Sequence, residues 1–157
     1  MDEDKQPKDA MDYLAMLVRT QGLLFSYVAR EYPQMDTADF IHFYMESKTR
    51  RVIDENEVGS HTLELKDLLE YIDKNEVYEF KKGKAIDPEI AEWIGEFYAY
   101  YQLCVNVPSR EMIKKIPVSY LVSIYPRFAN FDLEFVMQHI SQRLLLTIRS
   151  KRCYSGK

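Results

Sequence analysis

Apolar side chains along the chain recur mostly at intervals of three and four residues, the spacing that places them on one side of an α-helix. The longest such stretch covers residues 10–32, where only Arg19, Ser26 and Arg30 share a polar side. We expect this helix to end before Pro33, because a proline disfavours the helical conformation of the preceding residue. A helix this apolar is expected either at the centre of a bundle or at an interface between chains.

Capping and proline signals predict the other helices. Asp87, Pro88 and Glu89 give the clearest start, since an acidic cap, a proline at the first helical position and an acid in the first turn all favour a helix N-terminus. A helix from residue 117 is expected to stop at Pro126. Further helices are expected to start near Asp36 and Thr62, and the last helix is expected over residues 132–152.

Two segments have compositions that favour strands instead of helices. They are residues 49–54 and residues 77–80, and the second is followed by a Lys-Lys-Gly-Lys turn signal. We expect these segments to pair as a short two-stranded β ribbon. The expected fold class is therefore mainly α, a bundle of five to six helices with this ribbon added to it.

The length of 157 residues fits one domain or two small ones. We expect a single helical domain over residues 10–152, with a flexible acidic N-terminus at 1–9 and a basic tail at 153–157. The halves 10–80 and 87–152 each contain a long helix, a short helix and an amphipathic helix, so they are either distant copies or alike by coincidence.

Composition and charge narrow the function classes. The chain is 46% hydrophobic and 29% charged, so it can bury a core, and its net charge of −4 argues against a surface built for nucleic acid. The widely spaced glycines cannot form a phosphate-binding loop. No apolar run is long enough for a membrane span, and the polar start is unlike a secretory signal, so we expect a cytoplasmic protein. Lys48, Arg50 and Arg51 are expected in a solvated connection.

Candidate chemistry is sparse. His42, His61 and His139 lie far apart in the sequence, and Cys104 and Cys153 do not have the spacing of a metal site. No motif combines a nucleophile with a base. We therefore expect no catalytic, cofactor-binding or metal-binding residues, and a non-enzymatic protein is favoured over an enzyme.

Two stripes of small residues run along the predicted helices, one with a four-residue and one with a seven-residue repeat. A glycine inside a helix costs about 0.5–1 kcal/mol relative to alanine, so a close contact is expected to compensate for it. This predicts a helix seam, either between the two helices or with a helix of another chain. The seam residues are Ala91, Gly95 and Ala99 in one stripe and Ala15, Gly22 and Ala29 in the other.

A cluster of aromatic residues, Trp93, Tyr98, Tyr100 and Tyr101, lies on one predicted helix. Such rings either pack in the core or line a pocket for a ligand. The alternative to an interaction protein is therefore a small helical enzyme or ligand-binding protein whose pocket is lined by these four side chains.

The last predicted helix has a second apolar stripe, roughly opposite its core-facing side. If the helix is buried on one side only, Phe135 and Leu146 would be left in water, which predicts a surface covered by a partner. Coverage by other helices of the same chain is the alternative. The expected partner-binding residues, including a basic rim suited to an acidic partner, are Phe135, His139, Gln142, Leu146, Arg149 and Arg152.

Residues 92–102 have the sequence EWIGEFYAYYQ, followed by Pro108-Ser109-Arg110-Glu111 and by Tyr125-Pro126. With these motifs the chain resembles, over residues 87–140, a group of small helical bacterial proteins of toxin–antitoxin-type cassettes. The resemblance implies an antitoxin-like protein whose partner is a toxin encoded nearby, and it implies no catalytic residues. The apolar first helix separately predicts a homo- or hetero-oligomer.

Overall fold

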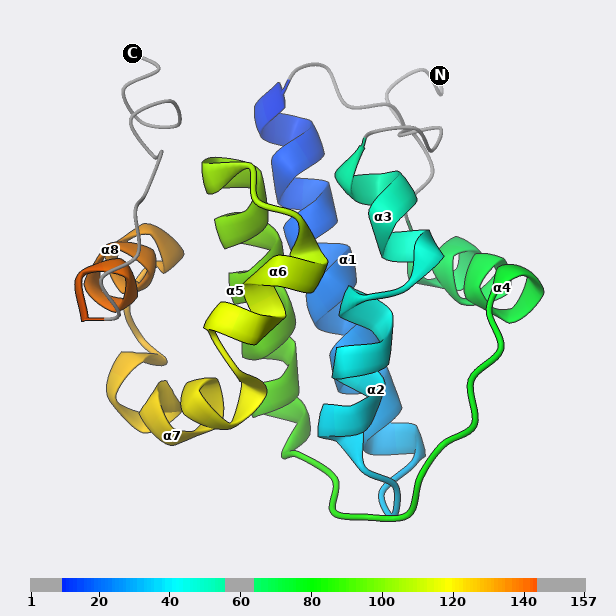
Figure 1. Ribbon diagram of the computed structural model, residues 1–157. Helices are drawn as coiled ribbons and strands as arrows, with labels where there is room; N and C mark the ends of the chain where they lie inside the picture. The colour runs from blue at the N-terminus through cyan, green and yellow to red at the C-terminus, as the bar shows by residue number, and fades with distance from the viewer. Residues whose placement is uncertain (1–9, 56–63, 144–157) are drawn as a thin grey trace, which may run out of the picture.

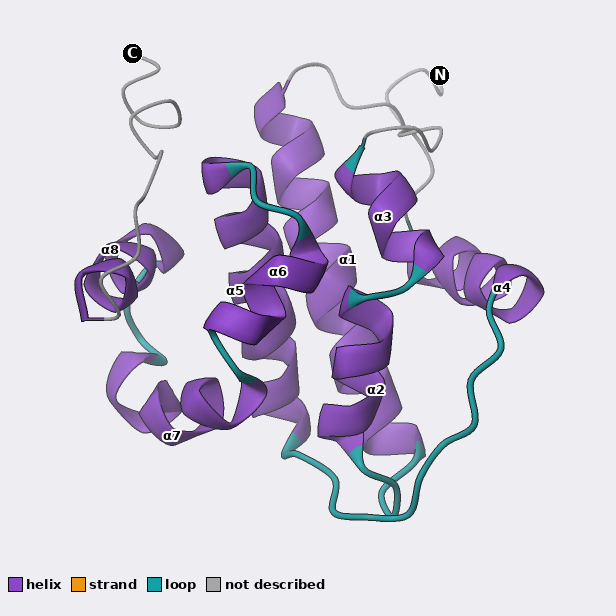
Figure 2. Ribbon diagram, in the orientation of Figure 1, coloured by secondary structure: helices purple, strands orange, loops and turns teal. Residues whose placement is uncertain are grey.

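The computed structural model describes residues 10–55 and 64–143, which form eight α-helices joined by loops (Figure 1, Figure 2). No strand occurs among these residues, so the mainly α fold class is confirmed for them. The helices are α1 Ala10–Glu31, α2 Thr37–Met45, α3 Lys48–Asp54, α4 Leu65–Asn75, α5 Pro88–Val105, α6 Ser109–Lys115, α7 Val118–Phe128 and α8 Leu133–Arg143. No helix in the described ranges is both long and apolar enough to cross a membrane.

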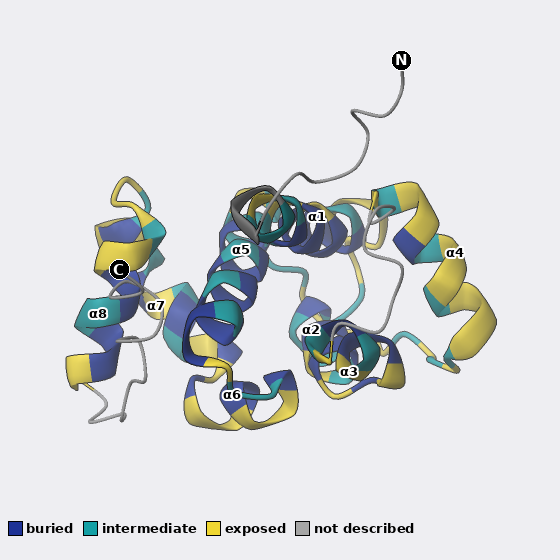
Figure 3. Ribbon diagram, turned by 90° about the horizontal axis from the view of Figure 1, so that it is seen from above, coloured by how far each residue is buried: buried dark blue, intermediate teal, exposed yellow. Residues whose placement is uncertain are grey.

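The two longest helices, α1 and α5, lie side by side at the centre and run in opposite directions (Figure 1, Figure 3). Their mutual contact is the most extensive between any two of the described helices. Leu24 and Phe25 of α1 and Ile94 and Phe97 of α5 have no exposed surface. Much of the apolar surface of α1 therefore packs within its own chain, as expected of a central helix, although Leu23 is 37% exposed.

Shorter helices surround this central pair. Helices α2, α3 and α6 cover one side of it, while α4 lies at one edge of the molecule and α8 at the opposite edge (Figure 1, Figure 3). Met112 of α6 and Ile140 of α8 are buried. In α4 only Leu68 is buried, so this helix covers the core less completely than its neighbours do.

Local signals place three of the helices where the sequence predicts them. Oδ1 of Asp36 accepts a hydrogen bond from the Asp39 N–H at 3.0 Å at the start of α2. Asp87 caps α5 in the same manner. Helix α1 ends at Glu31, before Pro33. For α4 the cap position is Glu64, whereas Thr62 lies outside the described residues.

The predicted β ribbon is wrong. Residues 49–54 belong to α3, because the Ser47 Oγ accepts from the Arg50 N–H at 3.0 Å and a carboxylate of Glu76 accepts from the Thr49 N–H at 2.6 Å. Residues 77–80 are extended but have no partner strand, and the one isolated bridge nearby pairs Met35 with Lys82. A short apolar segment does not reveal by its periodicity alone whether it forms a strand or a helix.

The predicted number of five to six helices is also wrong, since the described residues form eight, and α3 is a helix where a strand was expected. Helix α7 continues past Pro126 to Phe128. Pro126 lies in the last turn of α7 and removes the backbone hydrogen bond that its own nitrogen would donate to the carbonyl four residues earlier. Helix α8 is described as far as Arg143, so the expected helical residues 144–152, and the expected termini at 1–9 and 153–157, lie outside the described residues.

Candidate functional site

The two stripes of small residues meet where α1 crosses α5. A Cβ atom on Gly95 would lie 2.6 Å from the Gln21 carbonyl oxygen and 2.8 Å from the Gly22 Cα. A Cβ atom on Gly22 would lie 2.9 Å from the Glu92 carbonyl oxygen. Such distances are shorter than van der Waals contact, and backbone atoms cannot move aside as a flexible side chain can. The structure therefore places this part of the seam within one chain.

The alanines of the predicted seam are buried to different extents. Ala29, Ala91 and Ala99 are buried, whereas Ala15 is exposed. The short distance between the helices also allows Nε2 of Gln21 to donate a hydrogen bond to the Gly95 carbonyl oxygen at 2.9 Å. The closest contact is thus concentrated at the two glycines.

Two acidic side chains of α5, Glu92 and Glu96, lie beside the crossing. A Cβ atom on Gly22 would lie 2.7 Å from Cγ of Glu96. Partial burial raises the pKa of Glu96 above its ordinary value of 4.5, and the negative charge of Glu92 adds to this shift. The ionised form of Glu96 is therefore disfavoured in the folded protein.

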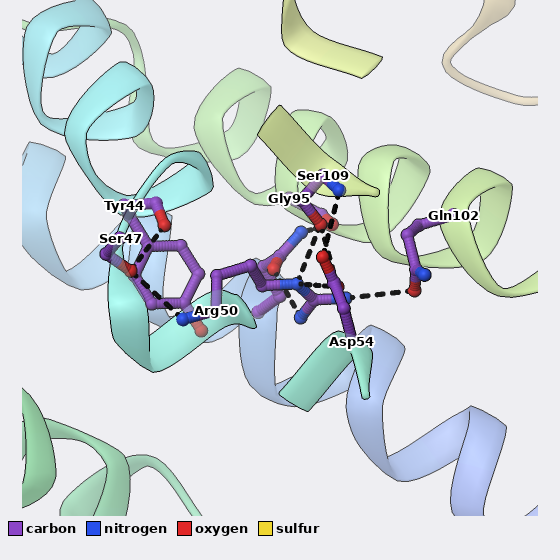
Figure 4. A network of polar contacts seen from close by, with 8 residues as sticks. Tyr44, Ser47, Arg50, Asp54, Gly95, Gln102 and Ser109 are labelled. Carbon is purple, nitrogen blue, oxygen red and sulfur yellow. Dashed lines mark hydrogen bonds and ion pairs between the residues drawn. The ribbon is translucent and has the colours of Figure 1, made fainter. Parts of the chain in front are cut away.

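Arg50 of α3 is the most unexpected residue of the interior, since only 1% of its surface is exposed. Its Nε donates to Asp54 Oδ1 and to Ser109 Oγ, both at 3.0 Å (Figure 4). The two terminal nitrogens donate to Gln21 Oε1 at 2.8 Å and to Gln102 Oε1 at 3.3 Å. One guanidinium group therefore connects α1, α3, α5 and α6.

Asp54 has a second role in this network. Its Oδ2 accepts from the Ser109 N–H at 2.9 Å, and its Oδ1 accepts from the Ser109 hydroxyl at 2.9 Å. The residue before Ser109 is Pro108, which gives α6 no side-chain cap. A carboxylate from α3 therefore caps the first turn of α6.

The expectation that Arg50 lies in a solvated connection is wrong, although its neighbours Lys48 and Arg51 are exposed. The only local signal for its burial is the spacing of four residues between Arg50 and Asp54 on α3. Its other partners, such as Gln102, are distant in the sequence, so only the tertiary structure brings them together.

Two tyrosine hydroxyls near Arg50, on Tyr13 and Tyr44, are buried and make no hydrogen bond of ordinary geometry with the described residues. Burial raises the pKa of both hydroxyls, while the positive charge of Arg50 acts in the opposite direction. Every nitrogen of Arg50 already donates to a protein oxygen. This network is therefore a clamp between helices, and its charge is balanced within the chain by Asp54.

The predicted pocket residues lie mostly in the core. Trp93, Tyr98 and Tyr101 are buried, and Tyr100 is half-buried. The Tyr98 hydroxyl donates to the Ile116 carbonyl oxygen, and the Tyr101 hydroxyl is 2.8 Å from Oγ of Ser141. The polar atoms of both tyrosines are thus used for packing α5 against its neighbours, and a ligand pocket lined by all four rings would require the core to open.

The predicted partner-binding residues are described only in part. Phe135 is 47% exposed, Gln142 is exposed and His139 is half-buried. Phe131 precedes the predicted helix and is not among the predicted residues. It is 50% exposed, and its ring centroid is 4.9 Å from that of Phe135. We call Phe131, Phe135 and His139 the aromatic patch. The remaining predicted residues, Leu146, Arg149 and Arg152, lie outside the described residues.

The aromatic patch lies on a rigid base. The buried ring of Phe128, from the end of α7, contacts the rings of Phe131, Phe135 and His139 with centroid distances of 6.0, 6.4 and 4.9 Å. The guanidinium carbon of Arg127 lies 5.4 Å from the Phe128 centroid. The two exposed rings are therefore held in place while one side of each faces solvent.

No group of three or more His, Cys, Asp or Glu side chains in the described ranges could hold a metal ion. Comparisons with protein-family models, with curated proteins and with solved structures found no match for this chain. Function is therefore inferred from the chain's own residues.

Proposed function

We propose that this protein is a non-enzymatic interaction module that binds a partner protein through the aromatic patch. The observation that carries the proposal is the pair Phe131 and Phe135, two rings in tilted contact that are each about half exposed. Large exposed aromatic groups are concentrated at binding surfaces, because covering them removes apolar area from water. Full burial of a Phe side chain contributes about 1.5–3 kcal/mol, so two half-exposed rings can anchor an interface.

The charges around the patch suit an acidic partner. Arg127 lies beside it and Arg143 ends α8. Asp132 and Glu134 are the acidic residues next to the two rings, and no acidic residue follows Glu134 in the sequence. Basic groups around an apolar centre favour a partner with complementary acidic groups, which they also attract at long range. The proposal therefore combines an aromatic anchor with the basic groups of Arg127 and Arg143 as the contacts for acidic groups of the partner.

The resemblance of residues 87–140 to proteins of toxin–antitoxin-type cassettes suggests which partner to test first. We propose an antitoxin-like role in the cytoplasm, with a toxin encoded nearby as the partner. Self-association through the same patch is the homo-oligomeric form of the proposal. Both the toxin-binding and the self-associating form of the proposal require the exposed rings of Phe131 and Phe135 to contact the partner.

The double variant Phe131→Ser with Phe135→Ser tests the proposal. We expect it to lose binding to the product of the adjacent gene, measured by calorimetry with purified proteins, or to lose self-association, measured by analytical ultracentrifugation. Its melting temperature is expected to change by no more than a few degrees, because both rings are half exposed in the wild type.

Tyr71→Ser is the matched control, since Tyr71 is 38% exposed on the distant helix α4 and its loss should leave binding intact. Unfolding of the double variant would show that the patch belongs to the core. A wild-type protein that neither self-associates nor binds the adjacent gene product would also contradict the proposal.

A further inference from the structure

A cavity of about 260 Å³ is lined by side chains of α1, of α4 and of residues 77–80. Helix α4 lies at the opposite edge of the molecule from α8, which carries Phe135 and His139 of the aromatic patch (Figure 1). We call this cavity the aromatic groove. The side chains that define its character are Tyr27, Tyr32, Tyr78, Phe80, Asp73 and Glu76.

The groove exists because α4 covers α1 incompletely. Leu69 and Ile72 of α4 face inward and line the groove, but they are only half-buried. After α4 the chain is extended, so that successive side chains point to opposite sides. Tyr78 and Phe80 therefore point into the protein, while Val77 is 99% exposed. This alternation supplies two aromatic rings to the groove.

The aromatic walls are held in fixed positions. The rings of Tyr32 and Phe80 are stacked with centroids 4.1 Å apart, and the Tyr78 ring meets Phe80 edge-on at 5.0 Å. The Tyr78 hydroxyl donates to Oδ2 of Asp39 at 2.6 Å, which fixes the orientation of its ring. A ligand would therefore meet a largely preformed surface, and little ordering would accompany its binding.

The charge of the groove is negative. Asp73 and Glu76 are the ionisable carboxyl groups of the lining, and none of the described lining residues is basic. Glu76 is fixed in place, since its Oε2 accepts from the Thr49 N–H and hydroxyl, both at 2.6 Å. The nearby Lys81 does not neutralise the groove, because it is paired with Asp39 at 3.6 Å on the other side of Tyr78.

From this arrangement we infer that the aromatic groove binds a small organic cation, a free alkylammonium or quaternary ammonium compound. The faces of aromatic rings attract such cations. Phe80 is stacked between Tyr32 and Phe40, so Tyr27 and Tyr32 carry most of this attraction, and the two carboxylates add to it. Ligand pockets for drug-sized molecules typically have volumes of about 300–1,000 Å³, so a cavity of about 260 Å³ suits a compact ligand. This site is independent of the interaction surface proposed above.

Choline and its uncharged isostere 3,3-dimethylbutan-1-ol test the inference on the full chain. We expect choline to cause saturable shifts in the aromatic NMR signals of Tyr32, Tyr78 and Phe80. The isostere has the same shape without the charge, so we expect it to bind about tenfold more weakly. Equal binding of the two compounds, or no saturable binding of choline, would overturn the inference.

Three variants locate the site. Tyr27→Leu removes a ring and Asp73→Asn removes a charge at an exposed position, so both are expected to weaken choline binding several-fold. Glu79→Gln is the matched control, because Glu79 lies on the outer side of the same extended segment. If Tyr27→Leu does not fold, Asp73→Asn against Glu79→Gln decides the question. Equal weakening by these two would show unspecific charge attraction and would refute the site.

Discussion

At Gly95 the backbone of α1 occupies the space that a Cβ atom would need. Replacing a glycine inside a helix by alanine ordinarily stabilises a protein by about 0.5–1 kcal/mol. Here the added methyl group would lie 2.6 Å from the Gln21 carbonyl oxygen, so the helices must move apart and the bond from Gln21 Nε2 to the Gly95 carbonyl oxygen is weakened. The close packing of the two longest helices therefore depends on the absence of a Cβ atom at Gly95, as it does at Gly22.

We expect Gly95→Ala to lower the free energy of unfolding by about 1–3 kcal/mol, the usual cost of overpacking. Urea denaturation followed by circular dichroism measures this change. Ala15→Gly is a control for helix propensity, since Ala15 is exposed on α1 and should cost only about 0.5–1 kcal/mol. A Gly95→Ala protein as stable as the wild type would show that the helices are not in contact at this position.

The raised pKa of Glu96 has a consequence for stability. Because burial and the charge of Glu92 raise this pKa in the folded state, the folded protein holds the proton more tightly than the unfolded chain does. Stability is therefore lost as the pH rises from the unfolded value of about 4.5 through the folded pKa.

We expect Glu96→Gln to raise the melting temperature at pH 7 and to have little effect below pH 4.5, where the wild-type carboxyl is protonated in both states. Melting curves from pH 3 to pH 8 measure the difference. The exposed Glu70, on α4, provides the control variant Glu70→Gln, which should show no comparable gain. A gain from Glu96→Gln that is the same at every pH would contradict the electrostatic explanation.

Among the helices, α6 depends on another element for its first turn. Asp54 of α3 accepts the Ser109 N–H and also balances the charge of Arg50. We expect Asp54→Ala to speed hydrogen exchange of the Ser109 amide and to destabilise the protein by about 3 kcal/mol, because a buried charge loses its partner. Asp87→Ala removes the cap of α5 and should affect the Glu89 amide without changing exchange in α6. Unchanged exchange at Ser109 in Asp54→Ala would disprove the cap.

The helices that the sequence predicts correctly carry their signals within themselves. Asp36 and Asp87 cap the helices that follow them, and the apolar pattern of α1 needs no information from elsewhere. Helix α3 has a local cap in Ser47, but another of its first amides is satisfied by Glu76, from beyond α4. Residues 77–80 have a strand composition, yet their expected partner forms this helix instead.

Some parts of the candidate sites can also be predicted from local sequence signals, and others depend on residues that are distant in the sequence. Gly22 and Gly95 are detectable because a glycine within a helix is costly wherever it occurs. The burial of Arg50 is not detectable, since its amide partners Gln21 and Gln102 come from other helices. The aromatic groove also escapes prediction, because Tyr27 and Tyr78 are brought together only by the path of the chain around α4.

For the molecule as a whole, the Arg50 network joins the two halves that the sequence suggested. Gln21 and Arg50 come from the first half, and Gln102 and Ser109 come from the second. The α1–α5 contact also crosses between the halves. We therefore expect the helices of residues 10–55 and 64–143 to unfold as one cooperative unit and not as two.

Arg50→Lys tests this dependence on one side chain. A lysine ammonium is compact and cannot reproduce the fork that reaches Gln21, Gln102 and Ser109 together, so at least one amide oxygen loses its donor. We expect a loss of about 3 kcal/mol in the free energy of unfolding, the cost of breaking a buried charged contact. Arg51→Lys is the matched control, because Arg51 is the next residue and is exposed.

Two spectroscopic probes show whether α5 unfolds together with the other helices. Trp93, the only tryptophan, reports on α5 by fluorescence, while far-ultraviolet circular dichroism reports on all the helices. In urea we expect both transitions of Arg50→Lys to shift together to lower concentration, because α1 and α5 remain packed against each other. Transitions that separate would show that the two halves fold independently. A midpoint equal to that of Arg51→Lys would show that the clamp contributes nothing to stability.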